Sequence, residues 1–256
     1  MNLSGHTQPF AVLGHPIGHT LSPVMHNAAF EHLGMDAVYL AFDVPPERLL
    51  EVLPAMAAMG FRGVNLTVPL KETAFQGLPD LDGSARRLGA VNTVQFLPGG
   101  LKGYNTDGEG FVRAIREAFK LKAAGQSIFI LGCGGAGRAV AITCAVEGAR
   151  RLWLADIDAR RPAKTADEIR ALAPKVQVEC VDTASASLTA LTASADLIVH
   201  ASPMGMKPGE SSPLHPKGFR AGQRAFDLVY NIPVTPFMKA AQPGGAQAVN
   251  GLGEEA

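Results

Sequence analysis

The sequence predicts an α/β protein of two domains, the second of which is a doubly wound parallel sheet. Short apolar runs alternate with helical patterns along the chain, which is typical of repeated strand–helix–strand units. One apolar run leads directly into a glycine-rich segment, a common junction between a buried strand and a helix. The 256 residues, 47% hydrophobic and 18% charged, are enough for one large or two modest globular domains.

The first third of the chain has the pattern of a βαβ unit followed by a further strand. Strands are predicted at 10–14, 38–44 and 63–68, with helices at 23–33 and 46–59. Ser22 is the expected N-cap of the first helix, Pro23 its first-turn proline and Gly34 its end. Pro54 should break or kink the second helix, because proline lacks the N–H that a helix interior needs.

A hairpin and a helix are predicted next. Residues 91–96 and 101–104 flank the turn signal Leu-Pro-Gly-Gly at 97–100. A helix over 107–119 then leads to residues 122–125, which we expect to form an interdomain hinge.

The second half contains a regular α/β series. Its strands are predicted at 128–131, 151–155, 176–180, 197–200 and 225–229. Helical or Gly/Pro-rich stretches separate most of them, which favours a parallel, doubly wound sheet. We therefore divide the chain into a first domain over 1–106, a second over 107–238, and a segment over 239–256 that starts to return toward the first domain.

Composition limits the partners of the protein. Lys+Arg and Asp+Glu number 23 each, so no net charge attracts nucleic acid or an anionic membrane. Every apolar stretch is interrupted before it reaches membrane-spanning length. Cys133, Cys144 and Cys180 form no close pair and predict reduced thiols in a cytoplasmic protein. The histidines lack a carboxylate cluster at ligand spacing, so we expect no metal, a small-molecule partner and a monomer or homodimer.

The glycine-rich segment predicts a dinucleotide site. Gly132, Gly134 and Gly137 follow a buried-strand run and, with Gly135 and Ala136, open a helix. Glycines in this pattern allow a tight turn, close approach to a pyrophosphate, and close packing of helix on strand. The helix N-terminus adds free N–H groups and the positive end of its dipole.

Asp156 bears on which dinucleotide is bound. It ends the next strand 19 residues after Gly137 (156 − 137), near the ~20 expected for the acid that binds the ribose hydroxyls. Its charge should repel a 2′-phosphate, which favours NAD over NADP. Arg160 and Arg161 could instead contact that phosphate if the loop curls back, and a solvated helix start is an equal alternative for them.

Several further motifs, in order along the whole chain, resemble those of the shikimate dehydrogenase family. They are GHPIGHTLSP at 14–23 with Met-His-Asn at 25–27, NLTVPLK at 65–71, AVNT at 90–93, NTDG at 105–108, the glycine loop at 132–137, ASPMGM at 201–206, DLVYN at 227–231 and NGLG at 250–253. The resemblance implies an NAD(P)-dependent oxidoreductase of the shikimate pathway. We therefore expect reversible oxidation of shikimate to 3-dehydroshikimate, in aromatic amino-acid (chorismate) biosynthesis.

The resemblance also implies the site residues. Lys71 and Asp107 are the candidate catalytic groups, a coupled pair within hydrogen-bond reach that handles the hydroxyl proton. The candidate substrate-binding residues are Thr20, Ser22, Asn65, Thr67, Asn92 and Tyr230, with the two hydroxyls at the first helix N-terminus suited to a carboxylate. The candidate cofactor-binding residues are Gly132, Gly134, Gly135, Ala136, Gly137, Asp156, Arg161, Ser202, Met204 and Gly253.

Departures from the family pattern keep two alternatives open. Asp-Ile-Asp at 156–158 stands where NADP-using relatives usually carry Asn-Arg-Thr, so an NAD-dependent quinate/shikimate dehydrogenase is one alternative. His200 stands where relatives often carry asparagine. After 250–253 the family continues with a methionine and a long helix, whereas this sequence ends Glu-Glu-Ala, so we expect weak binding of the acid and nearly normal binding of cofactor. A non-catalytic NAD- or metabolite-binding regulator is the other alternative.

Overall fold

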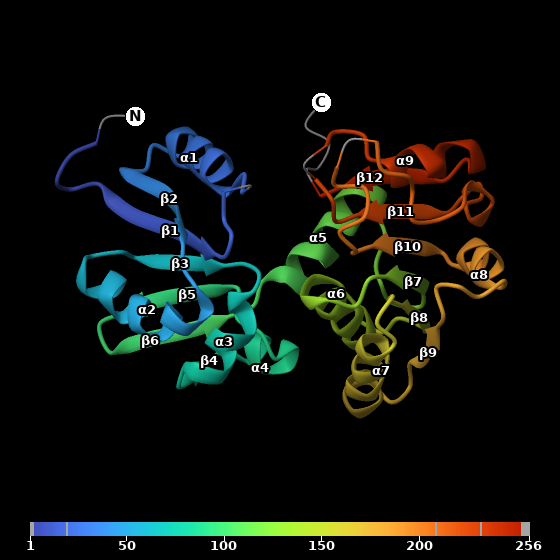
Figure 1. The fold of residues 1–256 in the computed structure, drawn as a ribbon, viewed down its shortest axis with the longest axis horizontal. Helices are drawn as coiled ribbons and strands as arrows, with labels where there is room; N and C mark the ends of the chain where they lie inside the picture. The colour runs from blue at the N-terminus through green and yellow to red at the C-terminus, as the bar shows by residue number, and fades with distance from the viewer. Residues whose placement is uncertain (1–2, 19, 208, 231, 252–256) are drawn as a thin grey trace. The chain divides into compact units, whose positions relative to one another are not determined.

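A computed structural model of the chain describes residues 3–18, 20–207, 209–230 and 232–251. The chain forms two compact units, Met1–Thr106 (unit 1) and Asp107–Ala256 (unit 2). Each unit contains one six-stranded sheet with helices packed on it (Figure 1). The predicted α/β class is therefore confirmed, with a mixed first sheet and an all-parallel second sheet.

Unit 1 has the sheet order β2-β1-β3-β5-β6-β4. Its strands are β1 (Gln8–Gly14), β2 (Ala37–Asp43), β3 (Gly63–Leu66), β4 (Asp80–Leu81), β5 (Thr93–Leu97) and β6 (Gly100–Tyr104). Its helices are α1 (Ser22–His32), α2 (Leu49–Ala58) after a 3-10 turn (Pro46–Arg48), α3 (Leu70–Gly77) and α4 (Gly83–Leu88). β1 pairs in parallel with β2 and β3, while β5 is antiparallel to β3 and β6.

The structure corrects two expectations about the helices of unit 1, a break at Pro54 and a cap at Ser22. Pro54 does not break the second helix, because Leu49, Leu53 and Met56 recur at helical spacing and are buried in the core of the unit. This burial outweighs the hydrogen bond that proline removes. Ser22 is not the N-cap of α1 but its first residue, and its side chain makes no capping hydrogen bond.

Unit 2 is a doubly wound parallel sheet with the order β12-β11-β10-β7-β8-β9. Its strands are β7 (Ser127–Leu131), β8 (Arg151–Ala155), β9 (Gln177–Val181), β10 (Leu197–His200), β11 (Arg224–Asp227) and β12 (Gln247–Asn250). Its helices are α5 (Asp107–Phe119), α6 (Gly135–Val146), α7 (Arg160–Leu172), α8 (Leu188–Ser194) and α9 (Pro236–Ala241), with 3-10 turns at Pro216–Gly218 and Gln242–Gly244. The strand order reverses between β7 and β10, the crevice at which such sheets bind ligands.

The segment at 122–125 is not a hinge between the units. The division falls after Thr106, and the segment lies inside unit 2. Ala123 is buried, and the N–H of Gly125 donates to the carbonyl of Gly148 over 2.8 Å. These contacts fix the segment between α5 and β7, so its Ala-Ala-Gly composition reflects tight packing and a turn.

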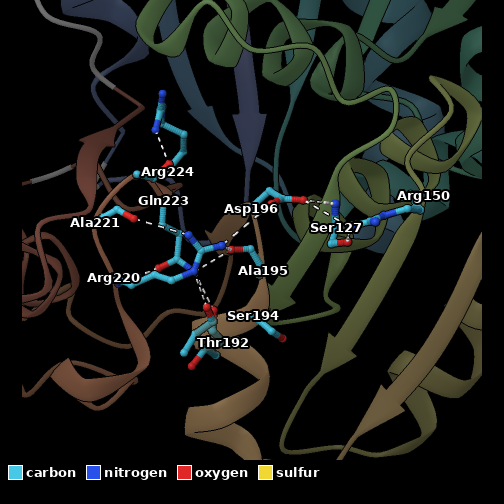
Figure 2. A network of polar contacts seen from close by, with 12 residues as sticks. Ser127, Arg150, Thr192, Ser194, Ala195, Asp196, Arg220, Ala221, Gln223 and Arg224 are labelled. Atoms are coloured by element: carbon cyan, nitrogen blue, oxygen red, sulfur yellow. Dashed lines mark hydrogen bonds and ion pairs between the residues drawn. The ribbon is translucent and has the colours of Figure 1, made fainter.

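A polar network closes the amino ends of β10 and β11, where α8 ends (Figure 2). The side-chain Nε2 of Gln223 donates to the carbonyls of Thr192 (2.6 Å) and Ala195 (2.8 Å). Arg220 donates through Nε to the carbonyl of Ala193 (2.6 Å). The last carbonyls of a helix lack the usual i+4 partners within it, so these side chains add hydrogen bonds at the end of α8, where the Thr192 carbonyl also accepts the N–H of Ala195 (3.2 Å).

Candidate active-site and dinucleotide-binding residues

The glycines after β7 are required by the packing of backbone on backbone. Gly132 has φ +97°, and a Cβ there would lie 2.6 Å from the carbonyl carbon of Ala201, which follows β10. A Cβ at Gly137 would lie 1.9 Å from the carbonyl oxygen of Gly132. Side chains at either position would therefore push the glycine loop away from α6 or from the neighbouring strand end.

The start of α6 leaves room for an anion. Among the described residues, nothing lies within 4 Å of a Cβ built on Gly134 or Gly135. The N–H of Arg138 donates to the carbonyl of Gly134 (2.8 Å) at the start of α6, so the amides of residues 135–137 lie at the open end of the helix. Exposed N–H groups and the helix dipole together suit a phosphate.

A pocket of about 240 Å³ lies beside this loop, entirely within unit 2. Its lining comes from the residues after β7, β8, β9 and β10: Leu131, Gly132, Gly134, Asp156, Ile157, Arg161, Thr183, Leu188, Ala201, Ser202, Pro203, Met204 and Pro213. Six candidate cofactor residues, Gly132, Gly134, Asp156, Arg161, Ser202 and Met204, are among them. Gly135, Ala136 and Gly137 begin α6 next to it, and Gly253 lies outside the described residues.

Asp156 holds the glycine loop as well as facing this pocket. Its Oδ2 accepts the N–H of Cys133 (2.7 Å), its Oδ1 accepts that of Asp158 (2.9 Å), and its side chain is only 5% exposed. Each carboxylate oxygen keeps a second lone pair with which it can accept a ribose hydroxyl. Arg161 Nη1 lies 3.8 Å from Asp156 Oδ1, so a cation lies beside the carboxylate.

The two arginines at the start of α7 differ in their contacts. Arg160 donates from Nε to Asp158 Oδ1 (2.8 Å) and is 90% exposed, so it points away from the pocket lining. This hydrogen bond lowers the pKa of Asp158 to about 2. Arg161 lines the pocket and is the arginine of the pair that is placed to meet a phosphate there.

Cys133 is not a reactive thiol in spite of its place in the glycine loop. Burial, with a smaller contribution from the charge of Asp156, raises the pKa of Cys133 to about 12. The thiol therefore stays protonated at neutral pH and acts as a small apolar group.

In unit 1 the candidate substrate residues gather at the carboxyl ends of β1 and β3. The N–H of His15 donates to the carbonyl of Val68 (3.2 Å), which joins the two loops that follow these strands. Thr67 packs against Gly14, where a Cβ would lie 2.6 Å from the methyl carbon of Thr67. Parallel strands place their carboxyl ends at one edge, and this register brings both loops together.

Thr20 and Ser22 form a hydroxyl pair. Thr20 Oγ1 donates to Ser22 Oγ (3.1 Å) and accepts the backbone N–H of Ser22 (3.2 Å). The pair therefore stands at the first turn of α1, where the helix dipole favours an anion.

The two candidate asparagines belong to one network. Asn65 Nδ2 donates to Thr93 Oγ1 (3.1 Å), which in turn donates to Asn92 Oδ1 (2.9 Å). Asn92 Oδ1 also accepts the backbone N–H of Thr106 (3.0 Å). The network thus connects β3 and β5 to the residue that immediately precedes Asp107.

Tyr39 and His26 connect the hydroxyl pair of Thr20 and Ser22 to Asn65. The sequence analysis did not identify Tyr39 as a site residue. The Tyr39 hydroxyl donates to Asn65 Oδ1 (2.6 Å), while the rings of Tyr39 and His26 stack at 4.1 Å. His26 Nδ1 lies 3.0 Å from the carbonyl of Ser22. Burial raises the pKa of Tyr39, so its hydroxyl remains a donor. The inward-facing place of Tyr39 in a strand was a usable signal, but strand alternation also fits an ordinary core tyrosine.

Lys71 lies near the start of α3, just after the loop that follows β3. It is partly buried, and its carbonyl accepts the N–H of Val91 (2.9 Å). β3 is an interior strand, so Lys71 does not follow an edge strand. Asp107 is the first residue of α5 in unit 2. Tyr230 of unit 2 is 46% exposed and lies beside Gly251.

The described part of the chain holds no cluster of three or more histidine, cysteine or acidic residues that suits a metal ion. In the same residues, no helix has both the length and the apolar character needed to cross a bilayer.

Comparison with known proteins identifies the relatives of this chain. Residues 12–94 match the family model of the shikimate dehydrogenase substrate binding domain. The chain is 40% identical to the shikimate dehydrogenase (NADP(+)) of Methanopyrus kandleri, over 99% of this chain and 88% of that relative.

Solved structures agree with the sequence match. Shikimate 5-dehydrogenase from Listeria monocytogenes, in complex with shikimate and NAD, gives a TM-score of 0.90 at 33% identity, over 98% of this chain and 89% of that one. Quinate dehydrogenase from Corynebacterium glutamicum, in complex with NAD, gives 0.86 at 30% identity, over 96% and 88%. Because identity at this level extends along nearly the whole of both chains, the protein belongs to the shikimate dehydrogenase family.

Proposed function

We propose that the protein catalyses the reversible oxidation of shikimate to 3-dehydroshikimate with a nicotinamide dinucleotide. The observation that carries this proposal is the sterically enforced glycine cradle at the switch point of unit 2, in a chain that belongs to this family. Unit 2 is then the cofactor domain, and unit 1, which contains the matched residues 12–94, the substrate domain.

The residues present fit the cofactor. The open N-terminus of α6 suits the pyrophosphate, and Asp156 has lone pairs left for a ribose. When bound, the nicotinamide ring accepts a hydride from the carbon that carries the hydroxyl group. In this proposal Lys71 and Asp107 act together on the hydroxyl proton: neutral Lys71 receives it, and the Asp107 carboxylate stabilises the ammonium that forms.

The rest of the proposed site recognises the acid. Thr20 and Ser22 bind the carboxylate through their hydroxyls and the dipole of α1. Asn65, Asn92 and Thr67 bind ring hydroxyls, because amides and hydroxyls both donate and accept. Tyr230 of unit 2 reaches the carboxylate.

NAD is the preferred cofactor in this proposal. The negative charge of Asp156 would repel the 2′-phosphate of NADP. Of Arg160 and Arg161, only Arg161 lines the pocket and could offset this repulsion. The relative from Methanopyrus kandleri carries NADP(+) in its name, and Arg161 makes NADP the competing cofactor here. The similarity to a quinate dehydrogenase in complex with NAD keeps quinate as a second substrate candidate.

The test combines each acid, shikimate or quinate, with each cofactor, NAD or NADP. The absorbance of reduced nicotinamide measures the reaction in all four mixtures. We expect reduction with shikimate, faster with NAD than with NADP at equal concentration. Reduction of the cofactor by quinate but not by shikimate would make quinate the substrate. A protein that binds the cofactor but reduces it with neither acid would be the non-catalytic regulator instead. With three unpaired thiols in the described structure, we further propose that the enzyme is cytoplasmic.

A further inference from the structure

A buried polar chain lies at the carboxyl ends of β10 and β11, and no role assigned so far uses it. His200, the last residue of β10, is 0% exposed, and its Nδ1 lies 2.8 Å from Asp227 Oδ1 at the end of β11. Its Nε2 lies 2.6 Å from Ser202 Oγ. Asp227 is also fully buried and accepts the Thr235 hydroxyl (2.6 Å) and the N–H of Val229 (2.9 Å).

The hydrogen bonds of this chain have a defined direction when the imidazole is neutral. An ionised carboxylate only accepts, so the proton shared with Asp227 resides on His200 Nδ1. In the neutral imidazole Nε2 is then an acceptor, and the Ser202 hydroxyl must donate to it. The stacked ring of Phe237 (5.3 Å) completes the enclosure of the imidazole.

Ser202 connects this buried chain to the dinucleotide pocket. It lines the pocket together with Gly132 and Asp156. Ser202 follows β10 and Asp156 follows β8, so the two residues lie on opposite sides of β7. Because its proton is directed at His200 and it accepts the N–H of Met204 (3.4 Å), Ser202 Oγ keeps one lone pair for a ligand and suits an N–H or O–H donor, such as a ribose hydroxyl or an amide. It does not suit a phosphate oxygen.

We propose that His200 is a positioning residue for dinucleotide binding, which acts through Ser202 and is itself oriented by Asp227. The inference rests on the proposed function, because it takes the pocket to hold a nicotinamide dinucleotide. A histidine that served only to satisfy Asp227 would need one ring nitrogen, whereas here the second nitrogen fixes the hydroxyl of a pocket residue.

Two substitutions separate the two contacts of the ring. His200→Gln places its terminal amide near the position of Nε2, so its oxygen can still accept from Ser202. His200→Asn keeps a donor near the position of Nδ1 for Asp227 but does not reach Ser202. The dissociation constants of NADH and NADPH are measured by the fluorescence of the bound nicotinamide, and the melting temperature is recorded for each variant.

We expect His200→Asn and Ser202→Ala each to weaken NADH binding about fivefold, the loss expected for one hydrogen bond. His200→Gln should stay within about twofold of the original chain. In the Ser202→Ala background, His200→Asn should add nothing further, because the two residues act as one unit. Gln223→Leu, a buried substitution at the opposite end of the same sheet, is the control and should lower the melting temperature without changing NADH affinity.

The inference is overturned if His200→Asn binds NADH like the original chain. It is also overturned if the double variant shows the product of both losses, about 25-fold, because His200 would then act independently of Ser202. If the original chain binds neither NADH nor NADPH, both this inference and the proposed cofactor fail. If it binds NADH and only the variants behave otherwise than expected, this inference alone fails.

Discussion

Tyr39→Phe tests whether the buried tyrosine orients the substrate amide of Asn65. The substitution removes one oxygen and with it the 2.6 Å hydrogen bond to Asn65 Oδ1, and it leaves the packing of the ring on His26 in place. Tyr39 is only 3% exposed, so water does not readily replace the lost donor. Asn65 would then keep its bond to Thr93 but lose the contact that fixes its oxygen.

The expected cost follows from this burial. The loss of this part-buried hydrogen bond should cost ~1 kcal/mol, which corresponds to a loss of about 2–4 °C in melting temperature for a chain of this size. If Asn65 contacts a ring hydroxyl as proposed, a misoriented amide should also raise KM for shikimate about fivefold, the equivalent of ~1 kcal/mol, with little change in kcat.

Tyr104→Phe is the matched control in the same sheet. The Tyr104 hydroxyl donates to Gln95 Oε1 (3.0 Å) at an exposed position, so solvent can replace it. Thermal unfolding and steady-state kinetics with shikimate are measured for both variants. Equal melting temperatures and equal KM values in the two variants would refute the assignment of Tyr39 as the residue that orients Asn65.

Four further substitutions, one of them with a matched control, test the other parts of the site and fold. Asp156→Ser should narrow the preference for NAD by removing the charge that repels a 2′-phosphate, and an unchanged NAD/NADP ratio of kcat/KM would contradict this. Lys71→Ala should lower kcat by about 10²-fold or more with a smaller effect on shikimate affinity, whereas unaltered turnover would remove Lys71 from the mechanism. Gly137→Ala should destabilise the protein by about 3 kcal/mol, because its Cβ would collide with a carbonyl oxygen, while Gly135→Ala in the same turn should be neutral or stabilising in chemical denaturation. Gln223→Leu should cost about 1–2 kcal/mol in the same assay, since two hydrogen bonds of a buried side chain are lost while the carbonyls of Thr192 and Ala195 keep the Ala195 N–H and Arg220 Nη2 as donors; a loss no larger than at an exposed glutamine would contradict the capping role.

Local patterns in the sequence were sufficient for most of the sheet. The strands at 151–155 and 197–200 were predicted with their observed bounds, because continuous apolar runs flanked by helical patterns are the signature of strands buried on both faces. The helix over 107–119 was predicted as observed, since its apolar residues recur at helical spacing on one face. The steric role of Gly137 was also readable, because its place in a strand–loop–helix motif specifies which atoms it approaches.

Elements without a periodic signal were missed. The short helices α3 and α4 and the last strand β12 have few residues, and four to eight residues contain too few repeats to distinguish a helix from a loop. Pro54 was misread because the rule for proline considers the lost hydrogen bond, whereas the buried residues on either side of it determined the outcome.

The sequence by itself determined the fold class, the family and the chemical types of the site residues, since these depend on patterns along the chain. Only the tertiary structure revealed that Tyr39 donates to Asn65, that Asp156 holds the glycine loop, and that His200 lies between Asp227 and Ser202. Each of these contacts joins residues 23 to 27 positions apart, except the hydrogen bond between His200 and Ser202, which are two positions apart. Their partners are chosen by strand register and sheet order, which are set by the packing of the whole unit and have no local signal in the chain.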